Sequence, residues 1–400
     1  MKDQTSKILN ALRMGVIPDT VLDELIVGRT QEMEELTNML EEIKNNGFGA
    51  VKFVKGEYGT GKSFMLNYMK QRAINEGFVV ASLSITGGFN FSKFDGLYTA
   101  IMSNLEIKSD HQSKGTNFEE IFENWLKNIK KEKEMNSASK DIYSVIAALN
   151  DYNNAFAMVL LTYIRAKINN DYELSNIAAS WIKGDKNVPY ELKKRLNVKG
   201  SVDIENAINV FRGFITLLSL IGYSGIMIFI DELEMVMGNR ADTRLKTYAN
   251  IRYIMDACGT GELEKCGFIF AGTKELFINE EKGFKSYNAL NQRIGSKISG
   301  GKGQVANLRQ PVIELNAFEQ EDYFKITEKI MAIHSSHYHY RAPVDLTTIY
   351  NLVMIECSKT DKERTTVRNY SKKLLEILDL IEQNPDLPIF KTKVSGLIRH

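Results

Sequence analysis

Residues 56–63 read Gly56-Glu57-Tyr58-Gly59-Thr60-Gly61-Lys62-Ser63, a complete G-x-x-x-x-G-K-[ST] phosphate-loop pattern. The preceding residues 50–54 (Ala-Val-Lys-Phe-Val) predict a buried strand, and residues 64–75 predict an amphipathic helix. Glycines in such a loop let backbone N–H groups turn inward around a β-phosphate, at the positive end of the helix. We therefore expect a nucleoside triphosphate site, in which Lys62 reaches the β- and γ-phosphates and the Ser63 hydroxyl holds Mg²⁺. The strand and helix on either side disfavour the alternative, a glycine-rich turn with an incidental Lys-Ser pair.

Composition narrows the class of protein. The chain has 400 residues, which suggests two or three domains, and its 51 Lys+Arg nearly balance its 50 Asp+Glu. This balance argues against a general polyanion binder, although it permits a local basic patch. The three cysteines show no paired or C-x-x-C spacing, so a disulfide framework is not expected. The chain shows no apolar signal-peptide core and no run of about 18 apolar residues, so we expect a cytoplasmic protein without a membrane partner.

Further apolar runs predict the rest of a sheet. Residues 78–84, 225–230, 267–273 and 311–315 read as strands, and the run at 225–230 is the most apolar of the chain. Residues 92–215 have an almost wholly helical pattern, and the chain after residue 316 reads as about three helices without a returning strand. Strands that alternate with helices predict a parallel, doubly wound α/β sheet, which binds ligands at the carboxyl ends of its strands.

Asp231 and Glu232 end the most apolar predicted strand. At the carboxyl edge of a parallel sheet, Asp231 can support Mg²⁺ and Glu232 can polarise a water for in-line attack on the γ-phosphate. Two acids after a strand could instead be an ordinary polar strand end, but the phosphate loop makes the catalytic interpretation the stronger one. The Asp-Glu pair favours hydrolysis over binding alone.

Thr273 ends the next apolar strand, and two interpretations of it stay open. Its hydroxyl could orient the attacking water or contact the γ-phosphate. It could equally cap the helix that begins at Lys274.

Together these motifs resemble an AAA+ ATPase, nearest the origin-recognition branch. More closely, they resemble the ATP-binding proteins of BREX-type bacterial phage-defence systems, a likeness that covers residues 11–90 and about 215–385. The segments that carry it are 11–18 (Ala-Leu-Arg-Met-Gly-Val-Ile-Pro), 27–29 (Val-Gly-Arg), 56–64, 230–234 (Ile-Asp-Glu-Leu-Glu) and 271–277 (Ala-Gly-Thr-Lys-Glu-Leu-Phe).

The resemblance implies ATP and Mg²⁺ as ligands. Ser63 and Asp231 would hold the metal, and Val27, Gly28 and Arg29 would lie against the adenine. The remaining contacts with the nucleotide would come from the loop and the residue after it, namely Gly56, Gly59, Thr60, Gly61, Lys62, Ser63 and Phe64.

The resemblance also implies two arginine roles. Arg368, in Thr366-Val367-Arg368 at the start of a helix, resembles the sensor-2 arginine of AAA+ lids, which folds onto the γ-phosphate. Its alternative is an arginine on a solvated helix face. Arg293 is the candidate arginine finger for a neighbouring subunit, and Arg309 is a weaker one. The chain departs from the family at Lys297, where related ATPases can carry arginine, because lysine lacks the planar fork that clamps phosphate.

We expect four parts: an N-terminal helical segment (1–25), an α/β nucleotide-binding core (26–91 and 216–315), a helical insertion (92–215) and a C-terminal all-helical lid (316–400). Two weaker features lie outside the predicted site. His334, His337 and His339 form an H-x-x-H-x-H string that we interpret as a solvated tract rather than a metal site. Lys302, in a glycine-rich loop, and residues 359–364 could contact nucleic-acid phosphates.

The main hypothesis is an AAA+ ATPase in antiviral defence, with a homo-oligomer or other defence proteins as partners and DNA as a possible one. A different class, a nucleotide-gated interaction module with little hydrolysis, is the alternative. A helicase motor is disfavoured, because the sequence shows one phosphate-loop core and no second motor domain.

Overall fold

The computed structural model describes residues 2–18, 22–88, 91–108, 118–132, 135–295, 307–360 and 365–384. The contacts divide the chain into two compact units. The first comprises Met1–Glu34, Lys55–Tyr68 and Glu314–His400, and the second comprises Glu35–Val54 and Met69–Ile313. The phosphate loop therefore belongs to the first unit, together with both ends of the chain, whereas Asp231 and Glu232 belong to the second. The four-part division made from the sequence stays a prediction.

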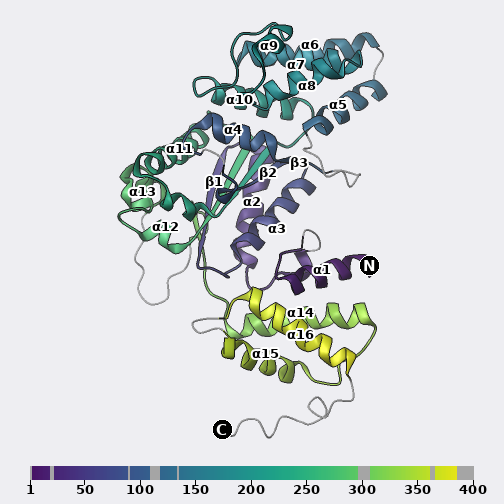
Figure 1. Ribbon diagram of the computed structural model, residues 1–400, viewed down its shortest axis with the longest axis vertical. Helices are drawn as coiled ribbons and strands as arrows, with labels where there is room; N and C mark the ends of the chain where they lie inside the picture. The colour runs from purple at the N-terminus through teal and green to yellow at the C-terminus, as the bar shows by residue number, and fades with distance from the viewer. Residues whose placement is uncertain are drawn as a thin grey trace. The chain divides into compact units, whose positions relative to one another are not determined.

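A six-stranded sheet has the strand order β3-β2-β4-β5-β1-β6. Figure 1 labels its strands β1, β2 and β3. Strands β2, β4 and β5 run parallel, and β3 pairs antiparallel with β2. The strands are β1 (Ala50–Gly56), β2 (Val79–Ser84), β3 (Leu105–Glu106), β4 (Ile226–Asp231), β5 (Cys266–Gly272) and β6 (Val312–Leu315). The prediction of an α/β, mainly parallel sheet is confirmed.

The central strands are apolar because both of their faces are covered. All residues of β5 are buried, and so are all those of β4 except Asp231 at its end. Phe53 of β1 is fully buried, and its ring stacks on that of Phe270 with the ring centroids 5.2 Å apart. This burial explains why the run at 225–230 is continuous rather than alternating.

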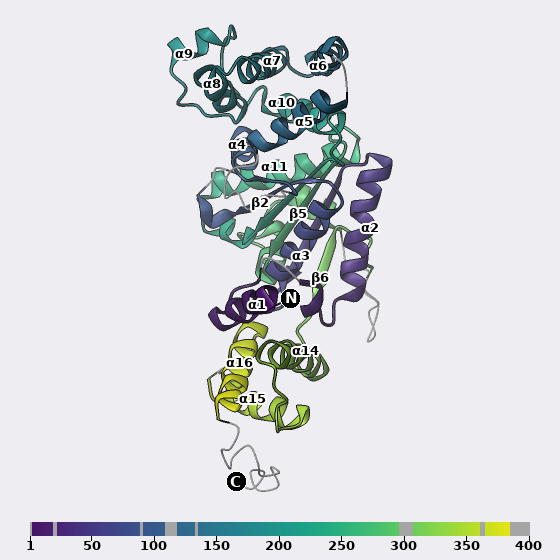
Figure 2. The same cartoon turned by 90° about the vertical axis from the view of Figure 1, so that its right-hand side faces the viewer.

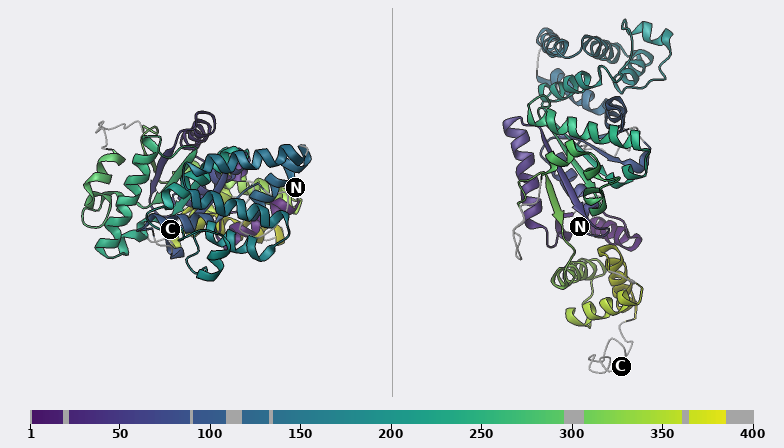
Figure 3. Two further views of the ribbon diagram at one scale, coloured as in Figure 1. Left: turned by 90° about the horizontal axis from the view of Figure 1, so that it is seen from above. Right: turned by 90° about the vertical axis from the view of Figure 1, so that its left-hand side faces the viewer.

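Helices fill most of the chain between β2 and β4, as predicted. They are α4 (Phe94–Ser103), α5 (Phe118–Glu132), α6 (Met135–Asn150), α7 (Asn154–Ile168), α8 (Tyr172–Ile182), α9 (Tyr190–Arg195) and α10 (Ala207–Leu220). Helices α6 and α8 each pack against α7, and Figure 3 shows this teal group from two sides. The two-residue strand β3 interrupts the helical stretch, because it pairs its backbone with β2 at the edge of the sheet.

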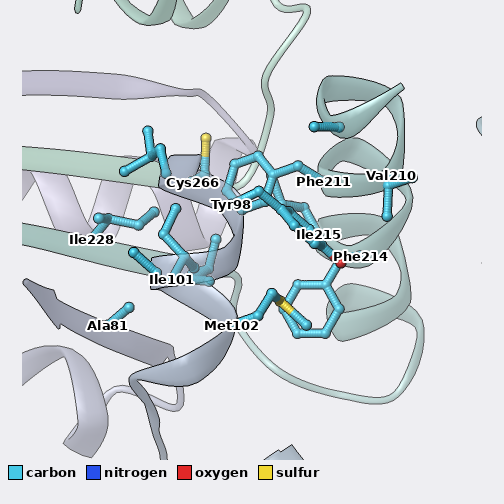
Figure 4. Close-up of a cluster of buried hydrophobic side chains, with 14 of the residues drawn as sticks. Ala81, Tyr98, Ile101, Met102, Val210, Phe211, Phe214, Ile215, Ile228 and Cys266 are labelled. Carbon is cyan, nitrogen blue, oxygen red and sulfur yellow. The ribbon is translucent and has the colours of Figure 1, made fainter. Parts of the chain in front are cut away.

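The insertion is anchored to the sheet by apolar side chains. Helix α4 packs on β2 and on α10. Figure 4 shows Tyr98 and Ile101 of α4 with Phe211 and Ile215 of α10, next to Ile228 of β4. Tyr98 is fully buried, and its hydroxyl donates a hydrogen bond to the carbonyl of Ile182. Since these side chains share one core with the strands, the insertion is part of the second unit.

Further helices and short 3₁₀ turns lie before and between the strands and outside the lid helices. They are η1 (Leu22–Leu25), α2 (Thr30–Asn46), α3 (Lys62–Asn75), η2 (Ile85–Gly87), η3 (Leu233–Gly238), α11 (Ala241–Gly259), α12 (Lys274–Ile278), η4 (Phe284–Ser286) and α13 (Asn288–Ile294). Within the described residues, every helix is too short or too polar to span a lipid bilayer.

A second apolar core holds the helical lid together. Helix α16 (Val367–Gln383) packs against α1 (Lys2–Met14), α14 (Gln320–Tyr338) and α15 (Leu346–Thr360), as Figure 2 shows. Leu374 and Leu378 of α16 are fully buried in this cluster with Ile8 of α1 and with Val27. The predicted C-terminal helical lid is confirmed for the described residues, and the N-terminal helix is built into the same core.

Candidate functional site

The phosphate loop connects β1 to α3 and needs glycine at two positions. Gly59 has a φ of 79° and Gly61 a φ of 93°, a region that side chains other than glycine rarely adopt. The carbonyl of Gly61 accepts the backbone hydrogen bond of Met65 at 2.9 Å and so begins α3. The first residues of α3 are Lys62 and Ser63, and the Ser63 side chain is exposed. The loop thus precedes a helix N-terminus, an arrangement that favours phosphate.

Lys62 is buried, and its ammonium group is held by the loop itself. Its Nζ donates to the carbonyls of Gly56 at 2.9 Å and Glu57 at 3.0 Å, and it lies 5.3 Å from the centre of the Tyr58 ring. The Thr60 hydroxyl donates to the same Glu57 carbonyl at 2.9 Å. The positive charge of Lys62 therefore lies at the loop. A bound phosphate would replace these carbonyl oxygens as the acceptor of its hydrogen bonds.

The segment Val27-Gly28-Arg29 lies in the same unit as the loop. Gly28 has a φ of 64°, and a side chain there would collide with the Asp322 carboxylate. Arg29 is 8% exposed, and its Nη2 donates to the carbonyl of Thr60 at 3.2 Å and to that of Asn316. Its guanidinium carbon lies 4.6 Å from the centre of the Phe318 ring.

Two residues near the ends of lid helices also reach the loop. A methyl group at Gly59 would lie 2.6 Å from Cγ2 of Thr366, and one at Gly61 would lie 3.7 Å from the ring of Phe318. Thr366 is the N-cap of α16, since its hydroxyl accepts from the backbone N–H of Asn369 at 3.2 Å. Sequence reasoning did not select Thr366 or Phe318 as site residues, because Phe318 belongs to no recognisable motif and Arg368 was selected from the segment 366–368 instead.

A cavity of about 740 Å³ lies in the lid next to Phe318. It combines aromatic, apolar and acidic side chains, and it is lined by Phe318, Glu319, Gln320, Glu321, Tyr323, Met354 and Thr365. Phe318, which forms part of its wall, also lies beside Gly61 of the phosphate loop.

Arg368 is exposed, and its aliphatic stem lies beside Gly15, where an added methyl group would be 3.3 Å from its Cγ. Within the segment 366–368, the contact with Gly59 comes from Thr366. The role of Arg368 as a sensor stays a prediction.

In the second unit, Glu232 has an unusual backbone and a fully engaged carboxylate oxygen. Its φ of 58° and ψ of 36° are left-handed, and its N–H donates to Oδ1 of Asp231 at 2.8 Å. Its Oε2 accepts hydrogen bonds from the hydroxyls of Ser84 and, at 2.8 Å, Thr86. These two bonds, that from Ser84 first, lower the pKa of Glu232 because they stabilise the charged form.

Ser84 and Thr86 were not predicted, although a signal was available. Ser84 is the last residue of β2 and pairs in register with Asp231, the last residue of β4. Polar residues at the carboxyl ends of adjacent parallel strands lie at one edge of the sheet. Searching the predicted strand 78–84 for a polar end would have found Ser84.

Thr273 follows β5 and is 5% exposed. It stands at the N-cap position of α12, yet its side chain makes no capping hydrogen bond. Its backbone N–H donates to Oε2 of the buried Glu234 at 3.2 Å. Geometry thus weakens the capping interpretation and leaves the hydroxyl role a prediction.

Arg293, the candidate finger, is paired within its own chain. Its Nε donates to Oδ1 of Asp256 and its Nη1 to the carbonyl of Ala289 at 2.7 Å. The hydrogen bond with Asp256 raises the pKa of Arg293. Arg309 is exposed. Lys297, Lys302 and residues 361–364 lie outside the described residues.

The histidine string does not converge on one point. His334 is fully buried, and its Nε2 lies 2.9 Å from Oδ1 of Asp379 while its Nδ1 lies 3.0 Å from the Tyr340 hydroxyl. His337 contacts the Thr5 hydroxyl at 2.9 Å instead. In the part of the chain that the structure describes, no cluster of three or more His, Cys, Asp or Glu side chains could hold a metal ion.

Comparison with known proteins identifies the family. The model of the family described as BREX system ATP-binding protein BrxC/D matches residues 1–394. No curated protein matches the chain.

Similar solved structures include the Aeropyrum pernix ORC1 protein in complex with DNA (11% identity, TM-score 0.40) and the Aeropyrum pernix ORC2 protein in ADPNP-ADP complexes (11% identity, TM-score 0.43). The first covers 93% of this chain and the second 89%, and each alignment includes 63% of the other chain. A structure of a DNA replication initiation factor has 10% identity and a TM-score of 0.39, and the alignment covers 92% of this chain. This chain spans 65% of that protein.

Proposed function

Because the chain belongs to the family of BREX system ATP-binding proteins BrxC/D, we propose that it is an AAA+ ATPase that hydrolyses ATP with Mg²⁺ in bacterial antiviral defence. In this proposal the phosphate loop binds the nucleotide, Asp231 supports Mg²⁺ and Glu232 activates the attacking water. Hydrolysis then changes the position of the helical lid, and the change acts on DNA or on DNA-processing partners.

The geometry of Glu232 is the observation that carries the hydrolysis proposal. A left-handed backbone at a residue other than glycine is unfavourable by about 1–2 kcal/mol, and it persists where the surroundings require it. Here it directs the carboxylate to two hydroxyls at the end of β2. The two hydrogen bonds hold the carboxylate ionised and oriented, which supports a role as a base.

The donor set suits Mg²⁺, which prefers hard oxygen ligands and keeps several waters. Ser63 is an exposed residue at the start of α3, and Asp231 is a partly exposed one at the end of β4. Mg²⁺ would neutralise charge on the β- and γ-phosphates. Lys62 would hold the same phosphates, and Glu232 would take the proton of the attacking water.

One observation favours the second candidate, a nucleotide-gated interaction module with little hydrolysis. Arg293 is bound to Asp256 of its own chain, so completing a neighbouring site would require breaking this pair. Without a finger, phosphate-loop enzymes turn over slowly.

The test is Mg·ATP hydrolysis per subunit at increasing protein concentration, with Glu232→Gln and the matched surface variant Glu281→Gln. Loss of a general base lowers the rate about 10²- to 10⁴-fold, so Glu232→Gln should bind ATP and barely hydrolyse it, while Glu281→Gln should behave as wild type. Wild-type turnover that Glu232→Gln leaves unchanged would refute the role of Glu232. Binding without turnover at any concentration would favour the module.

A further inference from the structure

Arg29 joins three segments of the first unit that are distant in sequence. One side chain, 8% exposed, contacts the phosphate loop at Thr60 and the chain leading into the lid at Asn316 and Phe318. It also lies 3.7 Å from Glu32, its neighbour one turn along α2. The contact with Thr60 bears on how the loop would bind phosphate.

The hydrogen bond to the Thr60 carbonyl orients the next peptide N–H. In a trans peptide the carbonyl and the following N–H lie in one plane and point in opposite directions, and the described peptide bonds are all trans. Nη2 of Arg29 donates to the Thr60 carbonyl at 3.2 Å and so fixes the direction of that carbonyl. The N–H of Gly61 therefore points away from Arg29, and the backbone N–H groups of such a loop are the donors that bind phosphate.

The same guanidinium holds the entrance to the lid. It donates to the carbonyl of Asn316 and stacks over Phe318, whose ring also faces Gly61. A planar fork can serve two carbonyls and a ring face together, whereas a lysine ammonium lacks this shape. A shift of the Thr60–Gly61 peptide and a shift of residues 316–318 would thus both act on the same side chain, that of Arg29.

The arrangement keeps a charge buried. Burial lowers the pKa of Arg29, against the attraction of Glu32 and Asp322, and its buried Nε has no hydrogen-bond acceptor among the described residues. A buried cation with an unused donor is unfavourable for folding alone. The contact of Arg29 with the phosphate loop offers a reason, other than stability, for burying this charge.

We propose that Arg29 is a positioning residue, which presents the Gly61 N–H to the β-phosphate and links occupancy of the phosphate loop to the lid through Asn316 and Phe318. This inference rests on the nucleotide-binding part of the proposed function and not on hydrolysis.

The test compares the affinities of wild type, Arg29→Met and Arg29→Lys for Mg·ADP and for Mg·pyrophosphate by calorimetry. Arg244→Lys is the matched control. The Nε of Arg244 is also buried without an acceptor among the described residues, and its Nη1 donates to the carbonyl of Asn239 at 2.9 Å, in the second unit. Losing one well-aimed donor to a charged group corresponds to about a tenfold to hundredfold loss of affinity. We expect this loss for both ligands in Arg29→Met, a smaller loss in Arg29→Lys and none in Arg244→Lys.

Pyrophosphate separates this role from contact with the nucleoside. Equal losses for ADP and pyrophosphate support positioning of the phosphate cradle, whereas a loss for ADP alone overturns it. If Arg29→Met does not fold, Arg29→Lys gives the same comparison. Unchanged affinities in folded Arg29 variants also overturn the proposal.

Hydrogen exchange of residues 367–383 tests the link to the lid. ADP should slow exchange there in wild type, and saturating ADP should fail to do so in the Arg29 variants. Equal protection in a saturated Arg29 variant overturns the link. Wild type that binds pyrophosphate but never hydrolyses ATP refutes the ATPase proposal alone.

Discussion

Replacing Gly59 by alanine tests whether the lid packs on the phosphate loop as the structure shows. The new methyl group would lie 2.6 Å from Cγ2 and 2.7 Å from Cβ of Thr366, about 1 Å inside normal carbon contact. Such overpacking is unfavourable by about 1–3 kcal/mol. The left-handed backbone of Gly59, with a φ of 79°, adds about 1–2 kcal/mol for alanine. Together Gly59→Ala should destabilise the first unit by about 2–5 kcal/mol.

Thr366→Gly separates the two contributions. Glycine at an N-cap is only a few tenths of a kcal/mol worse than threonine, and it removes both carbons that meet the methyl group. In the Thr366→Gly background, Gly59→Ala should therefore be unfavourable by only the backbone part, about 1–2 kcal/mol. A double-mutant cycle then yields a coupling of about 1–3 kcal/mol.

Nucleotide-free hydrogen exchange of residues 367–383 measures these differences, because each 1.4 kcal/mol changes the opening equilibrium about tenfold. Peptides from β4 and β5 in the second unit serve as the internal control. If Gly59→Ala accelerates exchange equally with and without Thr366→Gly, Thr366 does not contact the loop and the reasoning is wrong.

Three further outcomes follow from other contacts. Replacing Ser84 and Thr86 by alanine and valine should raise the pKa of Glu232, so the acid limb of the pH–turnover profile should move to higher pH; an unmoved limb would contradict the hydrogen bonds. Burial lowers the pKa of His334, so the unfolded chain is protonated first and the stability of the first unit should fall as the pH drops below about 6.5. His334→Gln should flatten that slope in thermal melts from pH 7.5 to 5.5. Phe53→Ala should destabilise the second unit by about 3–5 kcal/mol in hydrogen exchange of β4 and β5, since its ring is fully buried.

Most of the fold could be predicted because its elements have local signatures. The loop at 56–63 depends on glycines at set positions, and the buried strands are continuous apolar runs between helical patterns. Strand β3 was missed, because two residues have no period and their pairing with β2 depends on a distant segment. The assignments of ATP and of the family came from motifs in combination, and the family match covers residues 1–394.

The sequence by itself determined the phosphate loop, the buried strands and the acids that end β4, since each depends on neighbours within a few residues. Only the tertiary structure decided which groups meet them. Ser84 and Glu232 are 148 residues apart, and parallel pairing of β2 with β4 brings them together. Docking of α16 places Thr366 rather than Arg368 beside Gly59, and Arg29 meets Thr60 and Asn316 because the lid core includes Val27. Such contacts depend on how separate elements pack, which no local pattern records.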